Sequence, residues 1–207
     1  MYRSRPNLSI GFHGCDESIR NELVNRPNSV KKSQEAFDWL GHGFYVWENN
    51  FDRAFLWAKD KQKRNPLQKP SVLGVVFQLD YCLDFTDSEF TKLIGEYYEP
   101  MKSDLFAAGK QIPRNRDIRN DNDKDLVLRE LDCTLIEYMH QKIDEQIVED
   151  VHSKGFTDLR SFDTVRGIFT EGGPAFPGAG IQKKNHIQIC IRNLNCIKGF
   201  FIPRKKV

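Results

Sequence analysis

The sequence predicts an α+β fold in which a β-sheet forms the core and helices flank it. Strand-like and helix-like patterns alternate in the first part of the chain, and the C-terminal third changes to short strand-like runs between glycine-rich loops. The chain has 207 residues, of which 39% are hydrophobic and 29% are charged. This size and composition are typical of one globular domain, so we expect residues 1–207 to form a single domain.

The first half of the chain contains three strand candidates, rich in β-branched and aromatic residues: Leu8 to His13, Gly43 to Trp47 and Val72 to Leu79. A short helix is expected to follow the first strand at Asp16, because acidic residues favour a first helical turn. Asn50 is expected to cap the helix FDRAFLWAKDKQKR, whose apolar residues recur at helical spacing.

The second half begins with helices and ends in strands. Pro100 interrupts the helical pattern from Thr86 to Ala108, which predicts two helices there. The polar residues from Gly109 to Asp125 predict an exposed, mobile, charged loop, and apolar residues at i, i+4 spacing predict a core-facing helix after it. The last strands are predicted in VRGIFTEG, HIQICI and KGFFIP, with the loop-like segment GPAFPGAGIQKKN between the first two.

Charge and cysteine content limit the classes of function. The net charge of +2 is almost balanced, so it neither implies nor excludes a nucleic-acid partner. The five cysteines are scattered and include no C-x-x-C pair, which indicates reduced thiols and predicts no metal site. The N-terminus lacks the apolar segment of a signal peptide, and no apolar run is long enough to cross a bilayer. We therefore expect a cytoplasmic protein with no membrane partner.

Three short motifs carry the functional prediction: F-H-G at residues 12–14, G-x-G-F-Y at residues 41–45, and H-I-Q at residues 186–188, which opens a strand after a glycine-rich loop. Their order and spacing resemble the ADP-ribosyltransferase superfamily of the diphtheria-toxin and poly(ADP-ribose) polymerase type, including bacterial domains with the same fold. In that family, an H-G motif, a tyrosine motif before a helix, and a glutamate or its substitute on a later strand form the NAD site. The resemblance implies a split, antiparallel-rich β-sheet core with flanking helices around an NAD cleft.

The resemblance implies a role for several residues. His13 would hydrogen-bond the adenosine ribose of NAD, and Gly14 would let the backbone approach the nicotinamide carboxamide because it has no side chain. Tyr45 would stack on the nicotinamide ring, a contact typical of aromatic side chains. Phe55 or Trp57, from the helix that follows, would form the opposite wall of the cofactor site.

Gln188 occupies the place of the family's glutamate. The resemblance implies that it binds the 2′-hydroxyl of the nicotinamide ribose and steadies the charge that develops as nicotinamide leaves. His186 replaces the Glu or Gln of arginine-modifying relatives, which argues against arginine as the acceptor. Asp52 and Arg53 stand near the position where polymerase-type relatives carry a small hydroxyl residue. Glu171 is the candidate for a second catalytic acid, and the alternative for it is an exposed loop carboxylate without a role.

The predicted function is mono-ADP-ribosyl transfer from NAD to a macromolecular acceptor, a protein or a nucleic acid, with release of nicotinamide. The catalytic candidates are His13, Tyr45, Gln188 and Glu171. Relatives of this kind include bacterial toxins and defence effectors, which implies a cognate antitoxin as a partner. Two alternatives stay open. One is a binding module that keeps the fold without activity, and the other is an RNA 2′-phosphotransferase, which also has an H-G motif but needs basic residues to hold an RNA phosphate.

Overall fold

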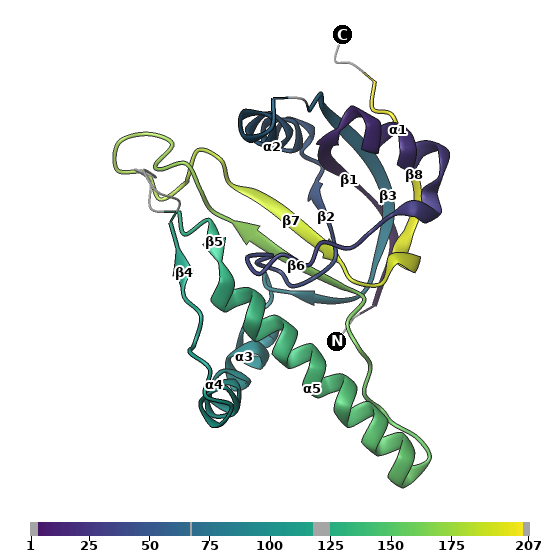
Figure 1. Cartoon of the computed structure of the whole chain (residues 1–207), viewed down its shortest axis with the longest axis vertical. Helices are drawn as coiled ribbons and strands as arrows, with labels where there is room; N and C mark the ends of the chain where they lie inside the picture. The colour runs from purple at the N-terminus through teal and green to yellow at the C-terminus, as the bar shows by residue number, and fades with distance from the viewer. Residues whose placement is uncertain (1–3, 67, 118–124, 205–207) are drawn as a thin grey trace.

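A computed structural model describes residues 4–66, 68–117 and 125–204 (Figure 1). The strands are β1 (Ser4–Asp16), β2 (Phe44–Glu48), β3 (Pro70–Asp84), β4 (Asn115–Arg116), β5 (Leu128–Arg129), β6 (Thr164–Phe169), β7 (His186–Ile191) and β8 (Ile197–Phe201). The α-helices are α1 (Glu17–Asn25), α2 (Phe51–Arg64), α3 (Ser88–Glu96), α4 (Tyr98–Ala107) and α5 (Glu130–Lys154). The α+β class and the flanking helices predicted from the sequence are confirmed.

The central sheet has six strands in the order β1-β2-β7-β6-β3-β8, with a further pairing of β1 with β3. Its strand pairs are antiparallel except for the parallel pair of β3 with β6. The long strand β3 joins two parts of this sheet, because its residues up to Tyr81 pair with β1 whereas Cys82 to Asp84 pair with β6. The sheet is therefore largely antiparallel, as expected.

Strands β1 and β2 are neighbours over a short length only. Gly11 pairs with Glu48 and Phe12 with Trp47, whereas His13 and the residues after it pair with β3 alone. On its other side, β2 pairs with β7 from Phe44 to Trp47. The two strands thus separate at the F-H-G motif, which places His13 at the point of separation.

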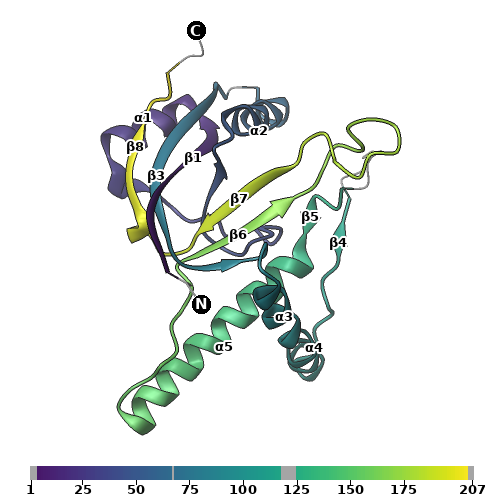
Figure 2. The same ribbon diagram turned by 180° about the vertical axis from the view of Figure 1, so that it is seen from behind.

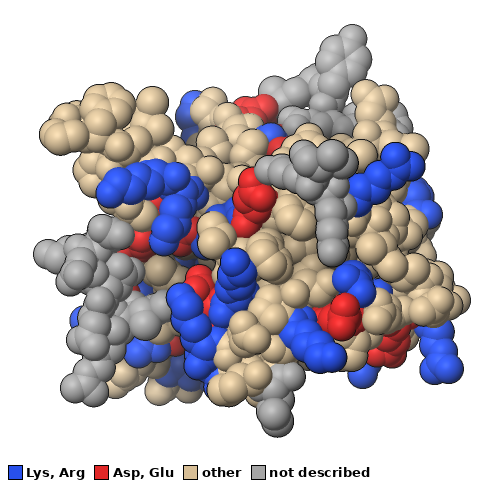
Figure 3. Space-filling view, turned by 90° about the horizontal axis from the view of Figure 1, so that it is seen from above, with Lys and Arg blue, Asp and Glu red and all other residues tan. Residues whose placement is uncertain are grey.

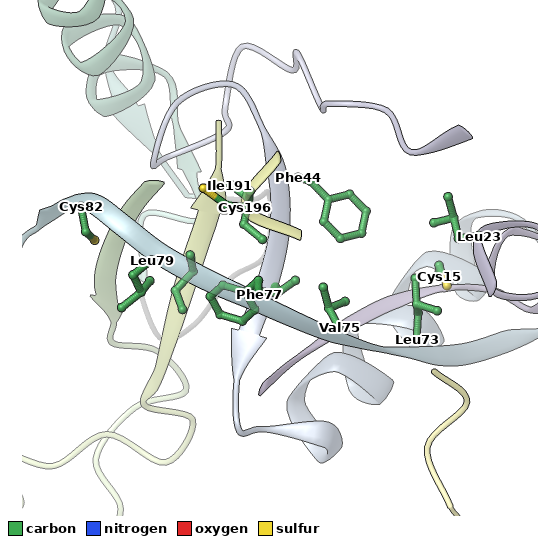
Figure 4. Close-up of a cluster of buried hydrophobic side chains, with 12 residues drawn as sticks. Cys15, Leu23, Phe44, Leu73, Val75, Phe77, Leu79, Cys82, Ile191 and Cys196 are labelled. Atoms are coloured by element: carbon green, nitrogen blue, oxygen red, sulfur yellow. The ribbon is translucent and has the colours of Figure 1, made fainter. Parts of the chain in front are cut away.

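The main hydrophobic core lies among β1, β2, β3 and β7 (Figure 4). Phe77 of β3 is completely buried there, together with Val46 of β2 and Ile189 of β7. The alternation of inward and outward residues explains this core, because residues two apart in a strand share one face. The opposite face of β2 and β7 carries Tyr45 and Gln188, and it is this face that contributes to the candidate site.

The helices gather at two ends of the sheet (Figures 1 and 2). Helices α1 and α2 lie at one end, whereas α3, α4 and α5 lie together at the other. Met139 and Ile143 of α5 are buried in a second hydrophobic cluster that also includes Phe90 of α3. The prediction of a core-facing helix after residue 125 is confirmed by these contacts.

The helical region around Pro100 is divided as predicted. Helix α3 ends at Glu96 and α4 begins at Tyr98, so Pro100 is the third residue of α4. The first backbone N–H groups of a helix have no intrahelical acceptor, and a proline there removes no hydrogen bond. The break therefore falls just before Pro100.

The predicted charged loop at 109–125 contains a short strand. Asn115–Arg116 forms β4 and pairs with β5, so the expectation of a plain exposed connection is wrong at these two residues. The side chain of Asn115 also accepts a hydrogen bond from the backbone N–H of Leu131 at 3.0 Å, near the start of α5. This contact connects β4 to the start of α5. Residues 118–124 lie outside the described part of the chain.

All five cysteines have free thiols and are buried. Burial raises the pKa of the Cys15 thiol to about 11, so this group stays protonated at neutral pH.

Within residues 4–66, 68–117 and 125–204, no helix is long and apolar enough to cross a membrane.

Candidate functional site

A cleft of about 670 Å³ opens where β1 and β2 separate. Its walls come from β1, β2, β7 and the end of β6, from helices α1 and α2, from the segment between α1 and β2, and from the residues around β5. The predicted site residues that line it are His13, Tyr45, Trp57, Glu171 and Gln188. Residues from motifs more than 170 positions apart thus share one cavity, whereas Gly14 and Phe55 are not part of its lining.

His13 is fixed at the cleft by two neighbours. Its Nδ1 lies 2.8 Å from the backbone oxygen of Tyr45, and its ring stacks on Phe44 with centroids 4.5 Å apart. Because a carbonyl oxygen can only accept, we assign the ring proton to Nδ1, which leaves Nε2 as an acceptor. Burial lowers the pKa of His13 to about 4, so the ring is neutral at pH 7.

Tyr45 uses its hydroxyl group within the protein. The hydroxyl donates to the backbone oxygen of Gly41 at 2.8 Å and accepts from the backbone N–H of Leu40 at 2.9 Å. Burial raises the pKa of Tyr45, so the phenol stays protonated. The hydroxyl therefore fixes the turn before β2, and only the ring is available to a ligand in the cleft.

Gly14 has a structural reason to be glycine. A Cβ at this position would lie 2.1 Å from the backbone oxygen of Ala54 in α2. Helix α2 can thus pack directly against β1 because residue 14 has no side chain. This reason differs from the one that the family resemblance implies, which is the approach of nicotinamide to the backbone.

Phe55 and Trp57 of α2 both pack against the small apolar cluster around Ala54, but only Trp57 lines the cleft. The ring of Phe55 stacks on Phe51, with centroids 6.2 Å apart, in the small apolar cluster around Ala54. Trp57 lines the cleft and lies 6.1 Å from the ring of Trp47. Of the two residues proposed as the second wall, the structure therefore brings only Trp57 to the cleft.

Gln188 faces Trp39, a residue that the sequence analysis did not identify. The indole Nε1 of Trp39 donates to Oε1 of Gln188 at 2.5 Å. Gln188 is opposite Trp47 on β2 and opposite Gly167 on β6, so it lies in the middle of the sheet face that borders the cleft.

Glu171 is buried, with 6% of its surface exposed, and it is not the exposed loop carboxylate of the alternative prediction. Nε of Arg53 donates to its Oε1 at 2.7 Å, and the two side chains form an ion pair. Nδ1 of His186 lies 3.8 Å from the same oxygen. Burial lowers the pKa of His186 to about 4, so the negative charge of Glu171 is balanced by Arg53.

Helix α2 contributes several cleft residues, of which the sequence analysis missed Lys61 and Arg64. Arg53, Trp57, Lys61 and Arg64 all line the cleft. Lys61 and Arg64 place their charged groups 5.7 and 5.9 Å from the Trp57 ring centre, and burial lowers the pKa of Lys61. These residues are spaced by four, four and three positions, which is the signal of one helical face. This spacing could have revealed them in the sequence.

Charged side chains of both signs lie on the face of the molecule that is seen from above. In the view from above, basic side chains gather in several groups with acidic side chains between them (Figure 3). Among the residues that the structure describes, no group of three or more His, Cys, Asp or Glu side chains is arranged to hold a metal ion. Beside its aromatic rings, the cleft contains the amide of Gln188, the neutral imidazoles of His13 and His186, cations such as Arg53, Lys61 and Arg64, and carboxylates such as Glu35, Asp38 and Glu171.

Comparisons with protein-family models, with curated proteins and with solved structures found no match to this chain.

Proposed function

We propose that this protein is a mono-ADP-ribosyltransferase with the split, antiparallel-rich fold of that superfamily, and that NAD is its co-substrate. One observation carries the proposal. His13, Tyr45 and Gln188, from three motifs far apart in the sequence, line a single cleft at the point where β1 and β2 separate. The cleft volume of about 670 Å³ lies within the usual range of small-molecule sites.

The residues of the lining suit three parts of NAD, namely a ribose, the nicotinamide ring and the diphosphate. Nε2 of His13 accepts a hydrogen bond from a ribose hydroxyl, since Nδ1 is already engaged by a backbone oxygen. The rings of Tyr45 and Trp57 offer flat apolar surfaces for the nicotinamide. Lys61 and Arg64, at the edge of the same cleft, are placed to bind the diphosphate, because both are cations close to the aromatic wall.

In the proposed reaction, the bond between C1′ of the ribose and the ring nitrogen of nicotinamide breaks. The electron pair leaves with nicotinamide, and the ribose becomes a short-lived oxocarbenium ion. A nucleophilic atom of the acceptor then attacks C1′ and loses its proton. Gln188 holds the ribose, and the buried carboxylate of Glu171 lies in the same cleft in an ion pair with Arg53.

The direct test is to measure nicotinamide release from NAD by the purified protein, with NAD labelled in its adenylate group to follow transfer. Protein, DNA and RNA acceptors are offered separately, so the labelled fraction identifies the acceptor class. We expect nicotinamide release and labelling of one class. NAD binding without release in any mixture would overturn the proposed activity and favour a silent binding module.

Substitution of Gln188 tests the site itself. We expect Gln188→Ala to lower nicotinamide release about a hundredfold, which is the order of effect when one oriented transition-state hydrogen bond is lost. The exposed His152 on α5 provides a matched control, because it lies outside the cleft and His152→Ala should leave the rate unchanged. A folded Gln188→Ala protein with the wild-type rate would remove Gln188 from the mechanism.

A further inference from the structure

Trp39 makes a specific contact with Gln188, although 149 positions separate them in the sequence. The donor is Nε1 of the indole and the acceptor is Oε1 of the amide, at 2.5 Å. An indole N–H can only donate, so the amide atom that faces it must be the oxygen. The orientation of the Gln188 amide therefore follows from the chemistry of its partner.

The indole of Trp39 is held in place from several sides. Residue 167, opposite Gln188 on β6, is a glycine, and a Cβ there would lie 2.7 Å from Cη2 of Trp39. The ring of Phe169 meets the indole edge to face, with centroids 5.2 Å apart. The guanidinium of Arg129 lies 5.0 Å from the Trp39 ring centre and 4.0 Å from that of Phe169. These contacts oppose rotation of the indole away from Gln188.

We propose that Trp39 is a positioning residue, which occupies the carbonyl oxygen of Gln188 and so presents its amide NH₂ group to the cleft as a hydrogen-bond donor. This inference rests on the proposed function, in which the ligand atom that accepts from Gln188 is a hydroxyl oxygen of the nicotinamide ribose. A glutamate in the same position can only accept from that hydroxyl when it is ionised. The oriented glutamine therefore reverses the direction of the hydrogen bond and leaves the hydroxyl proton for another acceptor.

A double-mutant cycle on nicotinamide release tests this role. Trp39→Phe keeps an aromatic ring between Gly167 and Arg129 but removes the indole donor. We expect the rate at saturating NAD to fall by about 2- to 12-fold, the equivalent of one net hydrogen bond. In the Gln188→Ala background, the same substitution should have no further effect, because there is no amide left to orient. Losses that simply multiply in the double variant would overturn the proposal.

A second measurement does not depend on activity. The indole N–H resonances of the three tryptophans can be assigned in heteronuclear NMR spectra of the full chain by single Trp→Phe substitutions. In Gln188→Ala, the Trp39 indole proton should move upfield as its hydrogen bond is lost, whereas the Trp57 resonance should stay in place. An unmoved Trp39 resonance would overturn the positioning role. A wild-type protein that releases no nicotinamide overturns the proposed function instead, and the resonance still decides whether Trp39 holds the amide.

Discussion

Arg53 and Glu171 lie 118 positions apart in the sequence and form an ion pair whose side chains are only 12% and 8% exposed. Arg53 belongs to helix α2, and Glu171 follows strand β6 at the start of the glycine-rich loop. The pair therefore joins two walls of the cleft directly. It also places a fixed negative charge and its counter-charge within the proposed NAD site.

Breaking this pair should be costly. Glu171→Leu leaves the guanidinium of Arg53 buried without its carboxylate, and we expect the free energy of unfolding to fall by about 3 to 5 kcal/mol. The double variant Arg53→Met, Glu171→Leu should recover much of this loss, because no buried charge remains. Urea denaturation of the wild type, both single variants and the double variant measures the effect. Additive losses in the double variant would show that the two charges do not depend on each other.

An exposed ion pair provides the control for this experiment. Lys63 and Asp60 on α2 are 77% and 46% exposed, and their charged atoms are 2.7 Å apart. Water and salt screen such a pair, so Asp60→Asn should leave the urea midpoint nearly unchanged.

Local patterns in the sequence were sufficient to predict most of the secondary structure. The side chain of Asn50 accepts from the backbone N–H of Arg53 at 3.0 Å and caps α2, as its position before an amphipathic run predicts. The division of the helical region before Pro100 also follows from local chemistry. These features depend on residues close together in the chain, which is why one sequence reveals them.

The side-chain partners in the cleft could not be predicted in the same way. The bonds of Trp39 to Gln188 and of Arg53 to Glu171 form only when the sheet and α2 bring distant segments together. The burial of Glu171 has the same origin, because its ion pair forms between the loop after β6 and helix α2. The three motifs thus contribute His13, Tyr45 and Gln188 to one cleft, whereas the prediction for Gly14 fails because helix α2 packs against it. The packing of distant segments also determines which side chains of the cleft are already paired.

Stability should fall as the solution becomes moderately acidic. Burial lowers the pKa of His13, His140 and His186 from the ordinary value of 6.5 to about 4. Between these two values, the unfolded chain binds protons that the folded protein does not. The free energy of unfolding therefore decreases as the pH falls from 6.5 towards 4, and this contribution is fully present above 6.5.

Urea midpoints at about pH 7.5 and about pH 5 measure this dependence. His140→Gln should reduce the difference between the two midpoints, because one buried imidazole is removed. The exposed His152 is the matched control, and His152→Gln should keep the wild-type difference. A stability that is constant over this range would contradict the burial of neutral histidines.

The packing of α2 on β1 predicts a strong effect of a single methyl group. In Gly14→Ala, the new Cβ would lie 2.1 Å from the backbone oxygen of Ala54, which must move together with the helix. We expect a loss of about 1 to 3 kcal/mol or more in the free energy of unfolding. Gly95 in α3 is the control, because a Cβ there meets no atom within 4 Å. Gly95→Ala should stabilise the protein by up to about 1 kcal/mol. Equal thermal midpoints for the two variants would contradict this account of Gly14.

The hydroxyl of Tyr45 should affect both the stability of the fold and the geometry of the cleft. It makes hydrogen bonds to the backbone of Leu40 and Gly41, which directly follow Trp39. Tyr45→Phe keeps the ring but leaves the N–H of Leu40, a completely buried residue, without its acceptor. We expect the free energy of unfolding to fall by about 1 to 3 kcal/mol, the penalty for an unsatisfied buried donor. Nicotinamide release should fall as well, because the turn that carries Trp39 loses its anchor beside Gln188.

Tyr138→Phe is the control for Tyr45→Phe, because it also removes a tyrosine hydroxyl but at an exposed position outside the cleft. The Tyr138 hydroxyl donates to Asp104 at 2.8 Å in an exposed position, where water replaces the lost partner. This variant should therefore keep both the urea midpoint and the rate of nicotinamide release. If Tyr45→Phe instead lowers the midpoint but leaves release unchanged, the turn at Leu40 does not determine the position of Trp39. If neither quantity changes, the Tyr45 hydroxyl is not an anchor, and its ring alone accounts for the residue's place in the cleft.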